Sequence, residues 1–292
     1  MVRPFLFFVL LWTLALLFLG SVVHATGSSL ACPDWPTCFG TMMPEMTGGV
    51  FWEHLHRLWA GALVVLFLVA VILVRRAYPD RTDLFRMGLA GLGLLIVQSV
   101  LGGLTVIFLL PDAISTSHLA LAFAFLALVT VMLVQTGPGH DHHEHRPGRQ
   151  VARRAGLWVA ALVFAQSVVG ALVRHTDAGM ACPDVPLCLG RVIPPLQYPL
   201  VGLHFLHRVL GLVVAVFVLH HSRLVWVRAR DPFRRRLAAA LAVGVVAQVL
   251  LGFASVFFRL EAPYVSTHTL LAATLLALGV AMAAHSRQPA PS

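Results

Sequence analysis

The sequence predicts an all-α integral membrane protein: eight transmembrane helices in two pseudo-symmetric four-helix bundles, with both termini in the cytoplasm. Hydrophobic residues make up 59% of the chain and charged residues 11%, a balance typical of membrane proteins. Eight apolar stretches also reach the length of about 20 residues that a membrane-spanning helix requires. Finally, motifs of the first half return in the second, which predicts two bundles of the same kind.

The predicted spans fall into two sets of four. The first set is 5–24, 52–74, 87–110 and 114–135, and the second is 156–174, 201–222, 237–258 and 264–284. Apolar runs of this length indicate helices, because the strands of a membrane barrel are shorter and alternate in polarity. Residues 5–24 share features with a signal peptide. We nevertheless expect a retained span, since the matching segment 156–174 must stay in the membrane.

Three motifs recur at a nearly constant offset. CPDWPTC at 32–38 returns as CPDVPLC at 182–188, and LHR at 55–57 returns at 206–208. STSH, ending at His118, returns as VSTH, ending at His268, and Gln98 and Gln248 share the same period of 150 residues. Such repetition predicts two fused, homologous halves, each with one cysteine pair and two histidines within its spans.

All 21 basic residues are arginines, and most lie in alternate connections between the spans. By the positive-inside rule, these connections and both termini face the cytoplasm, whereas the loops 25–50 and 175–200 lie outside. The formal net charge of +9 therefore reflects membrane topology, and we expect no nucleic-acid partner.

The repeat divides the chain into three parts. Residues 1–135 form an N-terminal four-helix half, 136–155 a His- and Arg-rich cytoplasmic linker, and 156–292 a C-terminal four-helix half. The linker contains histidines at 140, 142, 143 and 145, and His-rich tracts can bind metal. We interpret it as a solvated connection, because nothing in it fixes a ligand geometry.

Four spans carry a histidine a few residues inside their outer ends: His56, His118, His207 and His268. Ionisable side chains at such depth are costly and usually functional. Spans two and four run in the same direction, as do spans six and eight, so each half can place two imidazoles at one height. Two imidazoles without a carboxylate or thiolate suit haem iron, whereas zinc requires further ligands. The sequence thus predicts two haem pockets.

The halves differ beside these histidines. Glu53 stands three residues before His56, on the same helix face, whereas His204 occupies the matching position. We interpret Glu53 as a catalytic group of the first pocket; the alternative is an ion pair with Arg57 in the headgroup region. Arg57 and Arg208 directly follow the pocket histidines of their helices. The sequence does not decide whether these arginines bind haem propionates or lipid headgroups.

Both cysteine pairs lie in predicted outer loops, with five residues between their members: Cys32 and Cys38, and Cys182 and Cys188. The outer compartment is oxidising, so we expect a disulfide in each loop. This spacing differs from that of zinc knuckles. We interpret the second pair as a structural staple. For the first pair, two interpretations stay open: a structural staple or redox-active thiols. The second of these is considered because the pair lies over the half that contains Glu53.

Together these motifs resemble the haem A synthase family. The resemblance rests on CPDWPxC in the first loop, E-x-x-H-R at the start of span two, and the later histidines, and it covers essentially the whole chain. It implies an oxidoreductase that oxidises the C8 methyl group of haem O to the formyl group of haem A. It also implies a haem b cofactor on His207 and His268, the substrate haem between His56 and His118, and a required acid at Glu53.

By the same resemblance, the first-loop cysteines take part in haem handling or redox chemistry. The chain departs from the family pattern modestly. Val185 replaces the tryptophan of the first loop, and His54 adds a histidine before His56. Because His54 lies about 200° around the helix from His56, we expect it to face lipid headgroups or another helix.

Other functions stay open from the sequence: a dihaem b-type cytochrome that only transfers electrons, a haem carrier, and a membrane disulfide oxidoreductase. The first leaves the Glu53 asymmetry unexplained, and the last leaves the deep histidines unexplained. We expect a bacterial plasma membrane protein, since no amphipathic presequence precedes the first span. By resemblance, its partners are haem O synthase and cytochrome oxidase assembly factors, and small-residue runs leave a homo-oligomer open.

Overall fold

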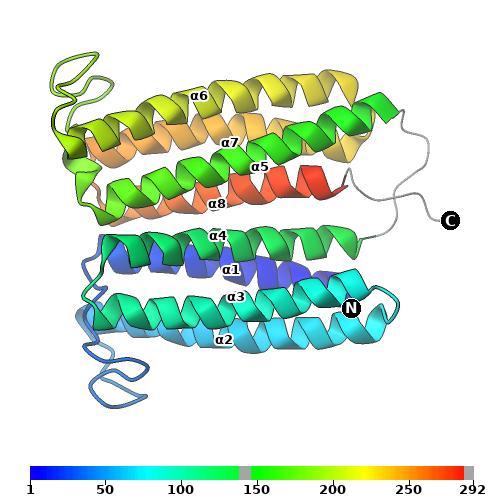
Figure 1. Ribbon diagram of the computed structural model, residues 1–292, viewed down its shortest axis with the longest axis horizontal. Coiled ribbons are helices and arrows are strands. Elements are labelled where there is room, and N and C mark those ends of the chain that lie inside the picture. Colours follow the sequence, from blue (N-terminus) through cyan, green and yellow to red (C-terminus); the bar gives the residue numbers. More distant parts are fainter. Residues whose placement is uncertain (138–145, 286–292) are drawn as a thin grey trace.

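The computed structural model describes residues 1–137 and 146–285 (Figure 1). These residues form eight long helices, each apolar enough to cross a membrane, and no strand beyond isolated bridges. The helices are α1 (Val2–Ala25), α2 (Gly48–Ala77), α3 (Thr82–Ile107), α4 (Asp112–Gln135), α5 (Arg146–His175), α6 (Pro199–Arg228), α7 (Pro232–Phe257) and α8 (Ala262–His285), with a short 3₁₀ turn, Ala178–Met180. The predicted all-α fold with eight membrane-spanning helices is confirmed.

Several helix ends differ from the predicted spans. The helix of the span 87–110 ends early, at Ile107, whereas that of the span 237–258 ends at Phe257, one residue from the prediction. Residues just beyond these ends have φ values of 52–63°, which a right-handed helix cannot contain: Leu109, Leu110, Arg259 and Leu260. Conversely, α5 begins at Arg146, so the second part of the predicted linker is helical. The four linker histidines lie outside the described residues.

The helices of each half lie together, α1–α4 in one group and α5–α8 in the other (Figure 1). Both cysteine-bearing loops extend from one end of the molecule, and the N-terminus lies at the opposite end. The groups meet where α8 packs on α1 and α4, and where α4 packs on α5. This arrangement agrees with the predicted topology, and the assignment of faces to cytoplasm and exterior stays a prediction.

One hydrophobic core runs through both groups of helices, and its largest fully buried side chains include Phe67, Phe123, Phe125 and Leu126. Glycines let the helices approach closely: a Cβ on Gly156 would lie 2.5 Å from the backbone nitrogen of Ala283 in α8. Many large apolar side chains point outward instead, among them Val65, Ile96 and Val243. An apolar exterior of this kind is what a lipid-facing helix requires.

Candidate functional site

The four predicted histidines lie on α2, α4, α6 and α8, near the end that bears the cysteine loops. Each imidazole packs against a glycine of the preceding helix. A Cβ added to that glycine would lie 2.9–3.3 Å from the imidazole Cε1 atom, in the pairs Gly20–His56, Gly102–His118, Gly170–His207 and Gly252–His268. A larger residue would displace the ring, so the repeated glycines hold four imidazoles in corresponding positions.

These imidazoles have the chemistry of metal ligands. The Nδ1 atoms of His56, His118 and His268 are shielded from water and make no hydrogen bond to any described residue. His207 and His268 line one cavity, and His56 and His118 occupy the matching glycine-backed positions of the first half. A buried nitrogen without a partner is costly, and ligation would relieve that cost. Around these pairs, the described residues provide no third ligand for a zinc site, so the donor set fits haem iron.

A cavity of about 440 Å³ lies in the second half, lined by both His207 and His268. Its volume is within the range of about 300–1,000 Å³ that is usual for ligand pockets. Gln166 and Arg174 of α5 add polar groups to a mostly apolar wall, and Phe123 of α4 completes it. The first half therefore contributes to a cavity whose histidines come from the second.

Glutamines contact both histidines of this cavity. The Gln166 amide lies 3.0 Å from His207 Nδ1 and donates to the His207 carbonyl at 2.8 Å. The Gln248 amide lies 3.3 Å from His268 Nε2 and 3.1 Å from its carbonyl oxygen. Gln248 has a counterpart in the first half, whereas Gln166 corresponds to Leu16. The contact that fixes His207 thus has no equivalent in the first half.

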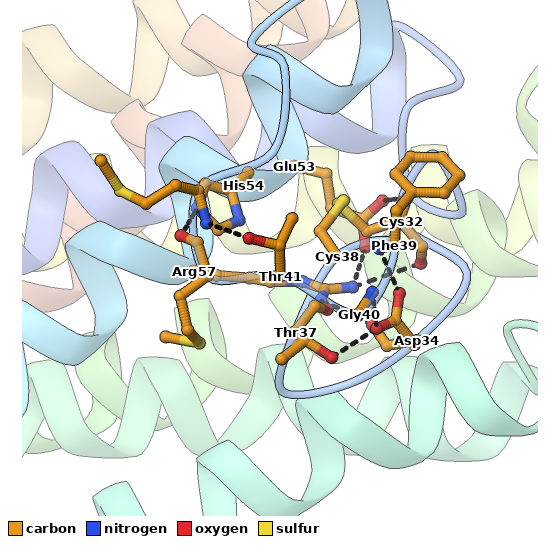
Figure 2. Close-up of a disulfide and its surroundings, with 12 residues drawn as sticks. Cys32, Asp34, Thr37, Cys38, Phe39, Gly40, Thr41, Glu53, His54 and Arg57 are labelled. Carbon is orange, nitrogen blue, oxygen red and sulfur yellow. Dashed lines mark hydrogen bonds and ion pairs between the residues drawn. A yellow bond between two sulfur atoms is a disulfide. The ribbon is translucent and has the colours of Figure 1, made fainter.

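Figure 2 shows the first disulfide loop, which is held on the start of α2. Cys32 and Cys38 are joined by a disulfide, as predicted. The Arg57 guanidinium donates to the carbonyl oxygens of Thr37 at 2.6 Å, Asp34 at 2.7 Å and Cys32 at 3.3 Å. One side chain of the membrane helix therefore binds three loop carbonyls.

Glu53 links the same loop to α2. Its Oε2 atom accepts a hydrogen bond from the Cys32 N–H at 2.8 Å, and its Oε1 atom accepts one from Arg57 at 2.6 Å. The carboxylate is buried, and this ion pair is the alternative that the sequence left open. Both oxygens of Glu53 therefore have partners one helical turn before His56.

An aspartate organises the tip of each loop. Hydrogen bonds from the Thr37 hydroxyl and the Gly40 N–H hold the pKa of Asp34 below its ordinary value. In the second loop, the Gly190 N–H lowers the pKa of Asp184 in the same way. The two loops thus have one design, in which an ionised carboxylate binds the backbone across the tip.

The second loop differs in charge where it meets α6. Cys182 and Cys188 form the predicted disulfide, and Arg208 donates to the carbonyls of Cys182, Asp184 and Leu187. His204, however, replaces the acid of the first half. It accepts from Arg208 Nε at 3.1 Å and donates from Nδ1 to the Ala178 carbonyl at 2.9 Å. An uncharged imidazole thus stands where the first half has a carboxylate.

The structure adds partners for two arginines and corrects one expectation about a histidine. Arg57 and Arg208 each use four of their five N–H donors on the loops and on residue 53 or 204 of the same helix. Contacts of either arginine to a haem propionate or a lipid headgroup stay a prediction. The expectation that His54 faces lipid headgroups or another helix is wrong. His54 is buried, its Nε2 atom lies 3.1 Å from the Met42 carbonyl, and it packs close to both sulfurs of the first disulfide.

A polar cluster that was not predicted from the sequence lies between the halves. Arg174 of α5 donates to the hydroxyl and the carbonyl of Ser21 in α1, at 2.9 and 2.6 Å. The rings of His24 and His175 meet edge to face at 5.3 Å, and the Thr116 hydroxyl lies 3.2 Å from His175 Nδ1. The 150-residue period provides a signal, because it pairs His24 with Arg174 just as it pairs the ring-backing glycines.

Comparisons with known proteins agree with this architecture. A family model described as cytochrome oxidase assembly protein, COX15-CtaA, matches residues 3–280. A protein named Heme A synthase from Symbiobacterium thermophilum is 35% identical over 247 residues, which cover 80% of this chain and 78% of that protein. Another of the same name, from Alkalihalophilus pseudofirmus, is 29% identical over 252 residues, covering 84% and 83%. A third, from Halalkalibacterium halodurans, is 30% identical over 223 residues, covering 71% and 74%.

Proposed function

The chain belongs to the COX15-CtaA family of cytochrome oxidase assembly proteins, and we propose that it is a haem A synthase. In this proposal it is an oxidoreductase that converts the C8 methyl group of haem O to the formyl group of haem A. The main structural support is the set of four imidazoles in corresponding, glycine-backed positions, two in each half. The similarity to relatives named Heme A synthase extends over most of the chain and supports the same reaction.

The second half, residues 156–292, would bind haem b as a resident cofactor. His207 and His268 line the cavity, and their imidazoles would hold the haem iron. Bound haem supplies the one-electron redox chemistry. The chain itself supplies position: Gly170 and Gly252 leave room for the rings, and Gln166 restrains His207 through two contacts.

The first half, residues 1–135, would bind the substrate haem O between His56 and His118. Both rings have an Nδ1 atom without a partner among the described residues. Leu16 stands where Gln166 restrains the second-half ligand, so the His56 ring lacks that contact. A less restrained ligand suits a substrate that must leave as product. The intervening segment 136–155 would connect the two halves.

Glu53 would act by position. Its two oxygens are occupied by Arg57 and by the Cys32 N–H, so proton transfer at this carboxylate would first require an ion pair to open. The same contacts fix the first turns of the helix that carries His56 beneath the disulfide loop. We therefore propose that Glu53 is a positioning residue, which keeps His56 and the disulfide loop in their relative positions. This role takes the place of the catalytic one expected from the sequence.

The proposed location is a bacterial plasma membrane, and the arginine distribution supports an orientation with the disulfide loops on the outer face. A haem O synthase would supply the substrate, and the assembly machinery of cytochrome oxidase would receive the product. The reaction is tested by expressing the full chain with a haem O source and analysing acid-extracted haem by chromatography. We expect haem A that is absent without the chain. Unchanged haem O beside a folded, haem-bearing protein would instead favour electron transfer or haem carriage.

A further inference from the structure

Arg174 is a cation in an unusual place. It lies in the last turn of α5 and lines the second-half cavity together with His207 and His268. Its contacts are to Ser21, through Nη1 to the hydroxyl and Nη2 to the carbonyl. Its Nε atom is shielded from water and has no hydrogen-bond partner in the described part of the chain. The Nη1 and Nη2 atoms each carry one further N–H beyond their contacts to Ser21, so two donors remain for a ligand in the cavity.

The charge of Arg174 is not balanced by the described residues. No carboxylate among them forms an ion pair with it, and Asp177, the acid that also lines the cavity, is exposed. The carbonyls at the end of α5 carry only about half a negative charge. A cation held away from water without a counter-charge is costly, so a ligand that brought an anion to this wall would be stabilised there.

The other arginine of the cavity is less suited to this task. Arg208 has committed four of its donors to the second loop and His204. In the first half, the position that corresponds to Arg174 holds His24, whose ring packs on His175. The guanidinium with available donors is therefore specific to the second-half cavity.

We propose that Arg174 binds a carboxylate of the ligand in the cavity lined by His207 and His268, which for haem b means a propionate. The guanidinium fork matches a carboxylate in charge and geometry. The same contact would hold the ligand at the boundary with α1, because Ser21 orients the guanidinium. This inference rests on the proposed function only for the identity of the ligand as haem.

The test is a thermodynamic cycle between protein and ligand. The full-length chain carrying His118→Ala, in which the first-half pair is incomplete, is prepared without haem and titrated with haem b and with its dimethyl ester, which lacks both propionate charges. We expect esterification to weaken binding by about 10- to 100-fold when Arg174 is present. With Arg174→Gln in addition, the two ligands should bind within about 2-fold of each other.

Two control variants separate binding from structure. Ser21→Ala removes the hydroxyl partner of Arg174 but keeps the cation, so the penalty for esterification should persist. Arg154→Gln removes an exposed arginine of the same helix and should also keep the penalty. An equal penalty with and without Arg174 would overturn the proposal. Should Arg174→Gln fail to fold, the penalty in the parent chain decides alone, and a value below about 2-fold would overturn it. Haem A production enters none of these measurements.

Discussion

The backbone N–H of Cys32 donates a hydrogen bond to Glu53 Oε2 at 2.8 Å, so the first disulfide loop is attached to the helix that carries His56. In the second half, Cys182 N lies 3.4 Å from His204 Nδ1, a nitrogen that donates to another carbonyl. The two halves therefore share their disulfide loops and differ in how these loops meet the membrane helices. In the first half the loop is bound by the carboxylate of Glu53, and in the second half an imidazole, that of His204, occupies this place.

Replacing Glu53 by Gln should lower haem A formation while haem b is retained. The change keeps the shape of the side chain but removes the charge that pairs with Arg57. A hydrogen bond between charged groups contributes about 1.5–3 kcal/mol, which corresponds to a roughly 10- to 150-fold loss of product if this ion pair is needed for turnover. The measurement is the ratio of haem A to haem b in extracted membranes.

Glu45→Gln is the matched control for this variant, because Glu45 is an exposed acid of the same loop. It should leave the haem ratio unchanged. A normal haem A yield from Glu53→Gln would show that the ion pair is dispensable. Loss of haem b from that variant would show a general folding defect instead.

Replacing Gln166 by Leu should loosen the second-half haem. The variant copies Leu16 of the first half and removes both contacts to His207. Losing about 1 kcal/mol of hydrogen bonding should speed haem release roughly fivefold and shift the reduction potential. Stopped-flow transfer of haem to an apo-globin and a redox titration provide the two readouts. An unchanged rate of haem release together with an unchanged reduction potential would show that Gln166 does not position His207.

The two disulfides should have similar effects on stability but different effects on activity. Each closes a loop with a sequence separation of 6, so the chain-entropy model assigns each about 2 kcal/mol. Serine replacement of either pair should therefore lower the melting temperature similarly. The Cys32/Cys38 variant should lose more haem A, because only that loop is joined to Glu53. Equal losses of product from both variants would contradict this assignment.

The first loop should open as the solution is acidified. Hydrogen bonds from Thr37 and Gly40 lower the pKa of Asp34. A carboxyl with a lowered folded pKa stabilises the structure above its unfolded value of about 3.9, and this contribution is lost as pH falls through the folded value. Hydrogen exchange at the Gly40 N–H, corrected for its intrinsic rate, should accelerate below about pH 4. In Asp34→Asn this acid-dependent change should disappear; its persistence would assign the opening to another group.

Much of the fold could be predicted from the sequence, because long apolar runs have few alternatives in a membrane. The helix ends could not: Leu109 and Leu110 are apolar, yet their positive φ values end α3 before the apolar run ends. The early start of α5 was missed for the opposite reason, since its first turns are polar and give no signal of a span.

Those parts of the candidate site that depend on spacing within one helix or on the internal repeat could be predicted from the sequence. Contacts that depend on packing between helices could not. The period identified all four histidines, and helix spacing allowed the Glu53–Arg57 pair that the structure contains. Which partner Arg57 prefers depends on the folded loop, and the Arg174–Ser21 contact joins segments 153 residues apart. Spacing within one helix carries no information on either contact.

Whether the chain has one substrate site and one cofactor site is tested most directly by the haem composition of membranes that contain the His118→Ala chain and a haem O source. We expect that haem A is lost and that haem b is retained on His207 and His268. Continued haem A formation, or loss of haem b from this variant, would contradict the division of the two halves.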